Sequence, residues 1–255
     1  MRHISIIGIG TGNPEHVTIQ AINAMNAADA IFIPTKGEEK DRLAEVRREI
    51  CRRYVTNAAA GLVEFAIPKR TTEDRTYVRS VDEWHAAIAE RYVRLIGDLP
   101  EGGKGAFLVW GDPSLYDSTI RIIERARHAG APEFELSVIP GITSIQALAA
   151  SHRIPVNLIG KPVEITTGRR LLADKDHGES MIVMLDGEQA FSKIDDPDAE
   201  IFWGAYLGTE DEIILSGRLG DISEEIVRTR AEARARHGWI MDIYLLRKGR
   251  DFDDL

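Results

Sequence analysis

The sequence predicts an α/β fold divided into two domains. Short apolar runs alternate with amphipathic helical patterns through the first half, which is typical of a parallel sheet. The second half has more strand patterns and fewer helices, which favours a mixed sheet. Gly130-Ala131-Pro132 interrupts the chain between the two patterns. We therefore expect an N-terminal α/β domain over residues 1–129 with a mainly parallel sheet, a C-terminal α/β domain over 130–255 with a mixed sheet, and a cleft between them.

The elements of the first half follow from apolar periodicity. Residues 4–9 are an apolar run that predicts a buried strand, and residues 17–28 have apolar residues on one helical face. A short strand over 30–33 is expected to stop at Pro34. The other expected elements are an amphipathic helix over 40–54, a strand over 61–67, a polar and basic loop over 69–79, a helix over 81–96, a strand over 106–110 and a helix over 118–128.

The second half is expected to begin with a strand over 136–139, a Pro140-Gly141 turn and a helix over 143–150. One long helix follows over 224–237, where Glu224 and Arg228 have the spacing of a helical ion pair. The remaining strands are expected over 164–166, 181–185, 201–206, 212–216 and 240–246.

Composition excludes several classes of function. The chain has 255 residues and a net charge of −9, which counts against a nucleic-acid binder. The single cysteine, Cys51, allows neither an intramolecular disulfide nor a cysteine metal cluster, and the seven histidines show no metal-ligand spacing, so we expect no metal. No apolar run reaches about 18 residues and no signal-peptide pattern opens the chain, which predicts a cytoplasmic protein without a membrane partner.

A glycine-rich turn, Gly8-Ile9-Gly10-Thr11-Gly12-Asn13-Pro14, follows the first strand. Glycines let the main chain approach a ligand closely. A nicotinamide-binding fingerprint would need a glycine at Asn13 and an acidic residue after the next strand, and both are missing. The nicotinamide hypothesis is therefore weak, and a turn without a ligand remains an alternative.

Two further turns have polar residues where a strand ends. Gly111-Asp112-Pro113 follows the strand over 106–110, where open α/β sheets bind ligands, although Asp112 alone also fits an Asx turn. Thr143 and Gln146 match a capping box at the start of a helix, and a helix N-terminus also offers free N–H groups to a carboxylate or ribose.

These three turns, in this order and spacing, resemble those of the tetrapyrrole methylases, a family of class III methyltransferases. The resemblance covers nearly the whole chain. It implies two α/β domains with S-adenosylmethionine (SAM) bound in the cleft between them and S-adenosylhomocysteine as product. The cofactor-binding residues that it implies are Pro14, Gly111, Asp112, Pro113, Thr143, Ser144, Leu185, Asp186, Leu207 and Met241.

Segments outside the three turns indicate which tetrapyrrole is the substrate. Three segments resemble those of family members that methylate ring carbon 1 of precorrin-5 and remove an acetyl group as acetate, in cobalamin biosynthesis. They are the run from Trp110 to Thr119, the run Val81-Asp82-Glu83-Trp84-His85 and the run Trp239-Ile240-Met241-Asp242. Family resemblance also implies a homodimer. The expected partner is thus a small tetrapyrrole, and neither nucleic acid nor membrane.

Loss of an acetyl group requires water to attack a carbonyl, and a general base assists such a step. Tyr116, Asp117 and His85 are the catalytic candidates, because they lie in these distinctive segments. His85 also fits a surface position beside an apolar tryptophan. A substrate with many carboxylates needs a local basic surface, for which the candidates are Arg70, Arg75, Arg79 and Arg121. Their alternative is a solvated basic loop.

Three other functions remain open. Another methylase of this family would act on a different precorrin, on ribosomal RNA or on a protein histidine. A regulator would bind SAM or a nucleotide without turnover. A nicotinamide oxidoreductase is the third.

Overall fold

The computed structural model describes residues 1–35, 41–68, 70, 77–173 and 178–248, and the chain divides into two compact units, Met1–Thr143 and Ser144–Leu255. The expected boundary at residue 130 is wrong. Strand β5 (Phe134–Ile139) pairs in parallel with β1 (Arg2–Gly8), so the chain returns to the first sheet after the Gly130 turn. The second unit begins only with helix α5 (Ser144–His152).

Unit 1 contains a five-stranded sheet in the order β3-β2-β4-β1-β5. Its other strands are β2 (Ala30–Thr35), β3 (Gly61–Ala66) and β4 (Lys104–Val109). Every pairing is parallel, which confirms the expected sheet. All five strands therefore end at the same edge, where α/β proteins bind their ligands.

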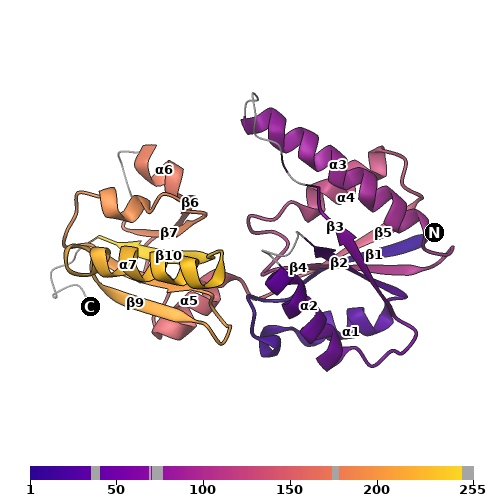
Figure 1. Ribbon diagram of the computed structural model, residues 1–255, viewed down its shortest axis with the longest axis horizontal. Helices are drawn as coiled ribbons and strands as arrows, with labels where there is room; N and C mark the ends of the chain where they lie inside the picture. The colour runs from indigo at the N-terminus through magenta and orange to yellow at the C-terminus, as the bar shows by residue number, and fades with distance from the viewer. Residues whose placement is uncertain (36–40, 69, 71–76, 174–177, 249–255) are drawn as a thin grey trace. The chain divides into compact units, whose positions relative to one another are not determined.

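Helices cover both faces of this sheet (Figure 1). Ile7 and Ile9 of the first strand and the turn after it pack with α1 (Ile19–Ala27) and α2 (Asp41–Tyr54). Ile4 and Ile6 point to the other face, under α3 (Tyr77–Gly97) and α4 (Thr119–His128). Because strand side chains alternate between faces, one short apolar strand contributes to two separate cores.

Unit 2 contains a mixed sheet in the order β6-β7-β10-β8-β9, as expected. Only β6 and β7 are parallel to each other, and the remaining pairs are antiparallel. The strands are β6 (Glu164–Thr167), β7 (Ser180–Met184), β8 (Glu200–Ala205), β9 (Ile213–Arg218) and β10 (Asp242–Arg247).

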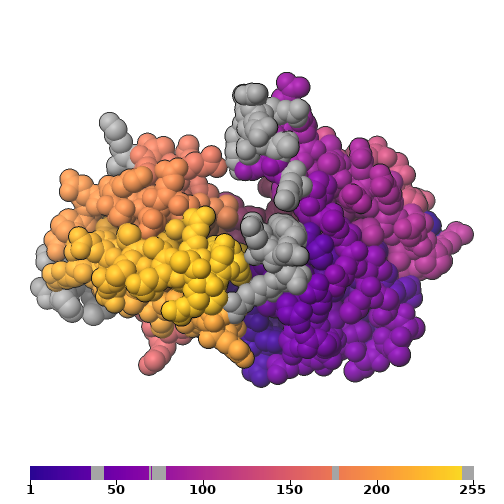
Figure 2. Space-filling view, viewed as in Figure 1, coloured from indigo at the N-terminus to yellow at the C-terminus, as the bar shows by residue number. Residues whose placement is uncertain are grey.

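Apolar residues of unit 2 also form two cores. Met181 and Val183 of β7 pack with α6 (Gly168–Ala173) and α7 (Leu219–His237). Ile182, between them, faces α5 on the other side. Helix α7 occupies much of the face of this unit seen in Figure 2.

Several element bounds differ from expectation. Helix α3 begins at Tyr77, so Arg79 is helical and not part of a loop. Strand β2 continues through Pro34 to Thr35, because it pairs there with β3 only, whereas its pairing with β4 ends at Phe32. Helix α7 begins at Leu219 rather than at residue 224, and neither α6 nor the short 3-10 helices η1 (Pro14–His16) and η3 (Ala190–Lys193) were expected.

Within the described ranges, no helix combines the length and the apolar character needed to cross a membrane.

Candidate functional site

The three turns named from the sequence meet at one edge of the unit 1 sheet. They follow β1, β4 and β5, which are neighbours in that sheet. A Cβ atom on Gly141 would lie 2.2 Å from the Gly111 carbonyl oxygen, and one on Gly8 would lie 2.6 Å from the Gly141 nitrogen. Gly10 and Gly111 also form a β-bridge. Glycine is required here because main chains of three turns are in contact.

Asp112 links the second turn to the third. Its Oδ2 accepts the Gly141 N–H at 2.8 Å, and its Oδ1 accepts the Ser114 N–H at 2.8 Å and the Ser114 hydroxyl. Partial burial favours the neutral acid, but these hydrogen bonds favour the carboxylate more, so the pKa of Asp112 lies below its usual value. The Asx turn is therefore present, and the same carboxylate also orders the Gly141 turn.

The first and third turns both lead into helices. The Asn13 side chain accepts the Glu15 N–H at 2.9 Å and begins η1, with Pro14 as its first residue. Helix α5 begins at Ser144, directly after Thr143, as the capping-box pattern predicts. Thr143 and Ser144 lie on opposite sides of the unit boundary in sequence.

The cofactor candidates after β7 differ in exposure. Leu185 is 66% exposed and has a φ of 54°. Asp186 is buried, and its Oδ2 accepts the Ala190 N–H at 2.6 Å and the Tyr244 hydroxyl at 2.8 Å. Burial together with the Asp186 charge raises the pKa of Tyr244, which keeps this hydroxyl protonated. The Asp186 carboxylate is thus engaged within unit 2, and its cofactor role stays a prediction.

The other unit 2 candidates lie on two adjacent turns. The Tyr206 N–H donates to the Met241 carbonyl oxygen at 3.0 Å, which holds the turns after β8 and before β10 together. Leu207 is buried in the core under α5, whereas Met241 is partly exposed. The sequence alone did not predict that Leu207 is buried and Met241 partly exposed.

Residues other than glycine have left-handed backbone in three of the turns that follow a strand. Tyr116, Leu185 and Tyr206 have φ values of 48°, 54° and 52°. Such values are unfavourable for residues with a Cβ atom and are frequent at functional sites. These turns follow β4, β7 and β8 and contain, or adjoin, predicted site residues.

Tyr116 and Asp117 line a cavity of about 260 Å³ within unit 1. The cavity lies near the ends of β2 and β4, and Pro34, Val109 and Thr119 are on its wall. Burial raises the pKa of Tyr116. Asp117 Oδ1 accepts the Thr119 N–H at 2.6 Å, at the start of α4. The structure therefore brings two of the three catalytic candidates to one cavity.

His85 is placed differently, on α3 facing α4. Its Nε2 is buried and has no hydrogen-bond partner among the described residues. Burial, and then Arg125 and Arg121, lower its pKa, so the imidazole is neutral at neutral pH. Trp84, the preceding residue, lines the cavity, but His85 does not. Its catalytic role remains a prediction.

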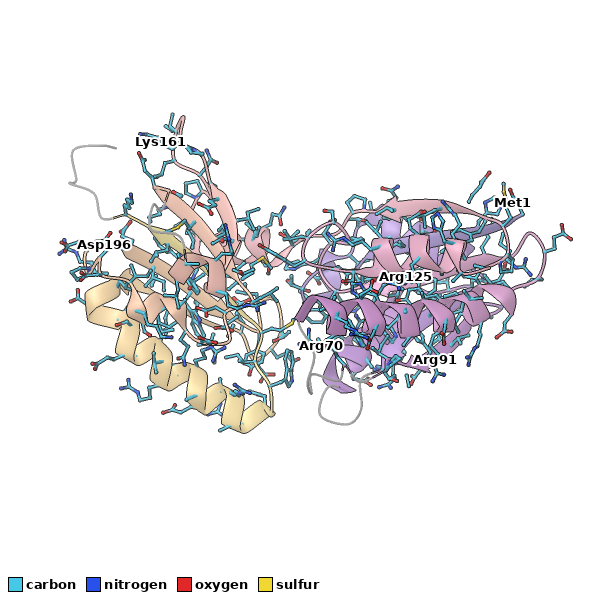
Figure 3. All side chains as sticks on the ribbon, turned by 90° about the horizontal axis from the view of Figure 1, so that it is seen from above. Met1, Arg70, Arg91, Arg125, Lys161 and Asp196 are labelled. Carbon is cyan, nitrogen blue, oxygen red and sulfur yellow. The ribbon has the colours of Figure 1, made fainter. Side chains whose placement is uncertain are left out.

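The basic candidates are spread over several elements. Arg70 is exposed after β3, and Figure 3 shows it at the end of unit 1 where α3 begins. Arg79 is exposed in the first turns of α3 and pairs with Glu83 at 3.1 Å, while Arg121 is exposed on α4. Arg75 lies outside the described residues. Arg70, Arg79 and Arg121 thus come from three different segments of unit 1, and their substrate role stays a prediction.

Two cavity residues were missed by sequence reasoning. Arg47 of α2 is 8% exposed although it belongs to a strongly charged helix, and Tyr92 of α3 is buried beside Phe65 and Phe107. Burial, assisted by the Asp117 charge, raises the pKa of Tyr92. A signal was present, because Arg47 has helical spacing to Leu43 and Ile50 and thus lies on the apolar face.

Potential metal ligands do not gather in the described parts of the chain: no group of three His, Cys, Asp or Glu side chains is found there. Cys51 is buried in the core, and burial raises the pKa of its thiol to about 11.

Five parallel strands, a second mixed sheet and close-packed glycine turns are the architecture of one protein family, and sequence comparison names that family. The model of the tetrapyrrole (corrin/porphyrin) methylase family matches residues 3–223. The chain belongs to this family, which confirms the resemblance inferred from the three turns.

A curated relative is more specific. The chain is 64% identical over 256 residues to the precorrin-6A synthase [deacetylating] of a Sinorhizobium species, covering all of this chain and 98% of the relative.

Solved structures agree with this assignment. A cobalamin synthesis related protein (CobF) from Corynebacterium diphtheriae superposes with a TM-score of 0.84 at 38% identity, covering 98% of this chain and 100% of that one. The uroporphyrin-III C-methyl transferase of Thermus thermophilus, solved with S-adenosylhomocysteine, has a TM-score of 0.58 at 16% identity, with 96% of each chain covered. The second likeness supports the fold alone.

Proposed function

We propose that this protein is a SAM-dependent C-methyltransferase that acts on a precorrin in cobalamin biosynthesis. The most specific form of the proposal is methylation of ring carbon 1 of precorrin-5 with release of the acetyl group as acetate, which yields precorrin-6A. The observation that carries it is the full-length similarity to a deacetylating precorrin-6A synthase.

The glycine turns fit a cofactor whose atoms must approach the main chain. At Gly8 and Gly141 a Cβ atom would collide with the backbone of a neighbouring turn, whereas nothing lies within 4 Å of the Cβ position of Gly111, so the main chain at Gly111 is unshielded. We assign cofactor binding to Pro14, the Gly111-Asp112-Pro113 turn and Thr143 in unit 1, with Ser144, Leu185, Asp186, Leu207 and Met241 in unit 2. When bound, SAM supplies an electrophilic methyl group. The chain's part is to orient the substrate carbon and to exclude water.

Removal of the acetyl group needs groups that handle protons. Asp117 is a carboxylate on the cavity wall and serves as the candidate base, with Tyr116 beside it in sequence. His85, Arg70, Arg75, Arg79 and Arg121 keep their proposed roles, His85 as a second candidate base and the arginines as carboxylate-binding residues.

The finer expectations on location and assembly are also proposals. We expect a cytoplasmic homodimer that binds neither nucleic acid nor membranes. A net charge of −9 supports the absence of a nucleic-acid partner. Light scattering of the purified protein tests the dimer.

The decisive experiment incubates the purified protein with SAM and precorrin-5. Mass spectrometry reads the macrocycle, and an enzymatic assay reads acetate. We expect one methyl group gained, the acetyl group lost and one acetate per turnover. A methylated product that keeps its acetyl group would remove the deacetylating role, and no product with any precorrin would favour the SAM-binding regulator.

Ligand competition tests the nicotinamide alternative. S-adenosylhomocysteine at 100 times its Kd should increase the free energy of unfolding by about 2.7 kcal/mol, which raises the melting temperature. NADH should leave the melting temperature unchanged. The reverse result would contradict the proposal.

Single variants separate the candidate bases. Loss of a general base costs about 100-fold or more in rate, so Asp117→Asn should reduce acetate release by that factor. His85→Ala is the companion variant, since its imidazole lies off the cavity wall. Full acetate release in either variant removes that residue from the role.

A further inference from the structure

The cavity of unit 1 combines an apolar wall with a buried cation. Trp84, Ile88 and Ile122 line it from α3 and α4, and Phe107 lines it from the sheet. Arg47 reaches it from α2, on the other side of the strand ends, and Asp117 lines it from the turn after β4. Polar side chains, among them Tyr92, Tyr116 and Thr119, share the wall with the apolar ones, and a pocket that combines both kinds of group suits a small molecule that has both.

Arg47 is buried without saturating its hydrogen-bond donors. Its Nε–H donates to the Leu108 carbonyl oxygen at 3.1 Å, and Nη1 donates to that of Leu43 at 2.8 Å. A guanidinium has five N–H groups, so three have no partner among the residues that the structure describes. A buried cation with unused donors is costly unless a polar or anionic group joins it.

Arg47 nevertheless stays charged. Burial lowers its pKa to about 10, and the Asp117 and Tyr92 charges oppose this only in part. At neutral pH the guanidinium is therefore a cation. Asp117, whose Oδ1 is occupied by the Thr119 N–H, forms no direct ion pair with Arg47 in the described part of the chain.

We propose that this cavity is an acyl subsite, in which Arg47 binds the oxygen atoms of the substrate's acetyl group and then of the acetate released from it. The inference rests on the proposed function and adds a binding residue to it. The apolar wall suits a methyl group, and the guanidinium suits a carbonyl oxygen or a carboxylate. A volume of about 260 Å³ exceeds the roughly 30 Å³ of one water several-fold, so the acyl group and a hydrolytic water fit together.

Removal of the acetyl group needs no reagent besides water and the methyl donor SAM. The water oxygen bonds to the acetyl carbonyl carbon, and the bond between that carbon and the ring carbon breaks. The electron pair of that bond passes to the macrocycle, where it neutralises the positive charge gained with the new methyl group. Acetate and two protons leave, and Asp117 is placed to accept the first proton. Arg47 stabilises the negative charge that develops on the carbonyl oxygen.

Binding of acetate to the full chain, without SAM, tests the subsite directly. Carbon-13 NMR of [1-¹³C]acetate measures its Kd for the parent protein, for Arg47→Gln and for Arg53→Gln. Arg53 is the matched control, because it is exposed on the same helix. A charged hydrogen bond contributes about 1.5–3 kcal/mol, so Arg47→Gln should weaken acetate binding about 10- to 100-fold, with Arg53→Gln unchanged. Equal affinity in both variants would overturn the proposal.

A second measurement does not depend on a variant that folds. In amide NMR of the parent protein, acetate should shift the signals of Leu108, Asp117 and Thr119, which line the cavity. Shifts confined to other surfaces, or none, would contradict the subsite.

Turnover separates this proposal from the proposed function. With SAM and precorrin-5, Arg47→Gln should release acetate roughly 100-fold more slowly and accumulate a methylated product that keeps its acetyl group. Acetate release at the parent rate would overturn the subsite. If the parent protein methylates no precorrin, the proposed function fails, and the two NMR measurements still decide whether the cavity binds acetate.

Discussion

At the scale of single residues, Asp112 has two functions in one carboxylate. It caps its own turn through Ser114 and holds the neighbouring Gly141 turn. Both contacts favour the ionised form, which is why its pKa is lowered. Because Asp112 orders main chain next to the proposed cofactor site, we expect its replacement to affect stability and cofactor binding together.

The first prediction concerns the pH dependence of this contribution. Asp112→Asn should lower the free energy of unfolding by about 1 kcal/mol at neutral pH, after allowance for solvent exposure. Because the folded-state pKa lies below the unfolded value of about 3.9, the contribution is complete above that value and is lost as pH falls through the folded pKa. Urea unfolding from about pH 7 to about pH 3 measures it. Asp98→Asn, at an exposed position, is the control, and a difference that stays constant with pH would contradict the argument.

Gly141 gives the second prediction. Its Cβ position lies 2.2 Å from the Gly111 carbonyl oxygen and 2.9 Å from the Gly8 Cα, and neither is a flexible side chain. Gly141→Ala should therefore cost about 1–3 kcal/mol of unfolding free energy and weaken SAM binding. Gly97→Ala, with nothing within 4 Å of its Cβ position, should be neutral or slightly stabilising. Denaturant titration and calorimetry check both variants. Unchanged stability and SAM affinity in Gly141→Ala would contradict this argument, because they would mean that the three turns accommodate a Cβ atom at position 141.

At the scale of elements, helix α7 is joined to strand β10 by a buried ion pair. Arg230 Nε donates to Asp242 Oδ2 at 2.8 Å, and each side chain is 7% exposed. The Trp203 indole N–H donates to the same carboxylate, and an Arg230 Nη donates to the Asp186 carbonyl oxygen. This network connects the helix to the turn after β7, where cofactor residues are proposed.

Breaking that network is the third prediction. Arg230→Ala leaves a buried carboxylate without its cation, which should cost about 3–5 kcal/mol. Arg228→Ala, exposed on the same helix, should change stability by no more than about 0.5 kcal/mol. Thermal and urea unfolding measure the stability of both variants. Equal losses of unfolding free energy would mean that the buried ion pair contributes no more than an exposed arginine.

At the scale of the whole molecule, each unit has a complete sheet with cores on both faces. Units of this size bury enough apolar surface to fold alone. We therefore predict that residues 1–143, expressed separately, fold cooperatively with α/β circular dichroism and dispersed amide NMR signals. A fragment ending at residue 129 lacks β5 and should fail, because the β1 edge loses its partner. A folded 1–129 fragment would contradict the boundary.

Strand and helix patterns determined most of the fold, because apolar periodicity reports which faces are buried. The unit boundary was misplaced for a local reason. Gly130 and Pro132 have the composition of a linker, but only pairing with β1 assigns the next strand to the first sheet. Pairing partners are distant in sequence, so local composition does not reveal them.

The sequence by itself determined the family, since three turns with recognisable chemistry follow one another along the chain: a turn rich in glycine, a turn with an aspartate acceptor and a turn that starts a helix. The tertiary structure alone decided which charged residues are buried. Arg47 belongs to a charged helix, yet packing against the sheet removes it from water and leaves it facing a cavity with Asp117. The spacing of Arg47 to Leu43 and Ile50 places it on the apolar face of its helix, but what lies opposite that face is decided by other elements, whose cavity-lining residues are spread over 34–122.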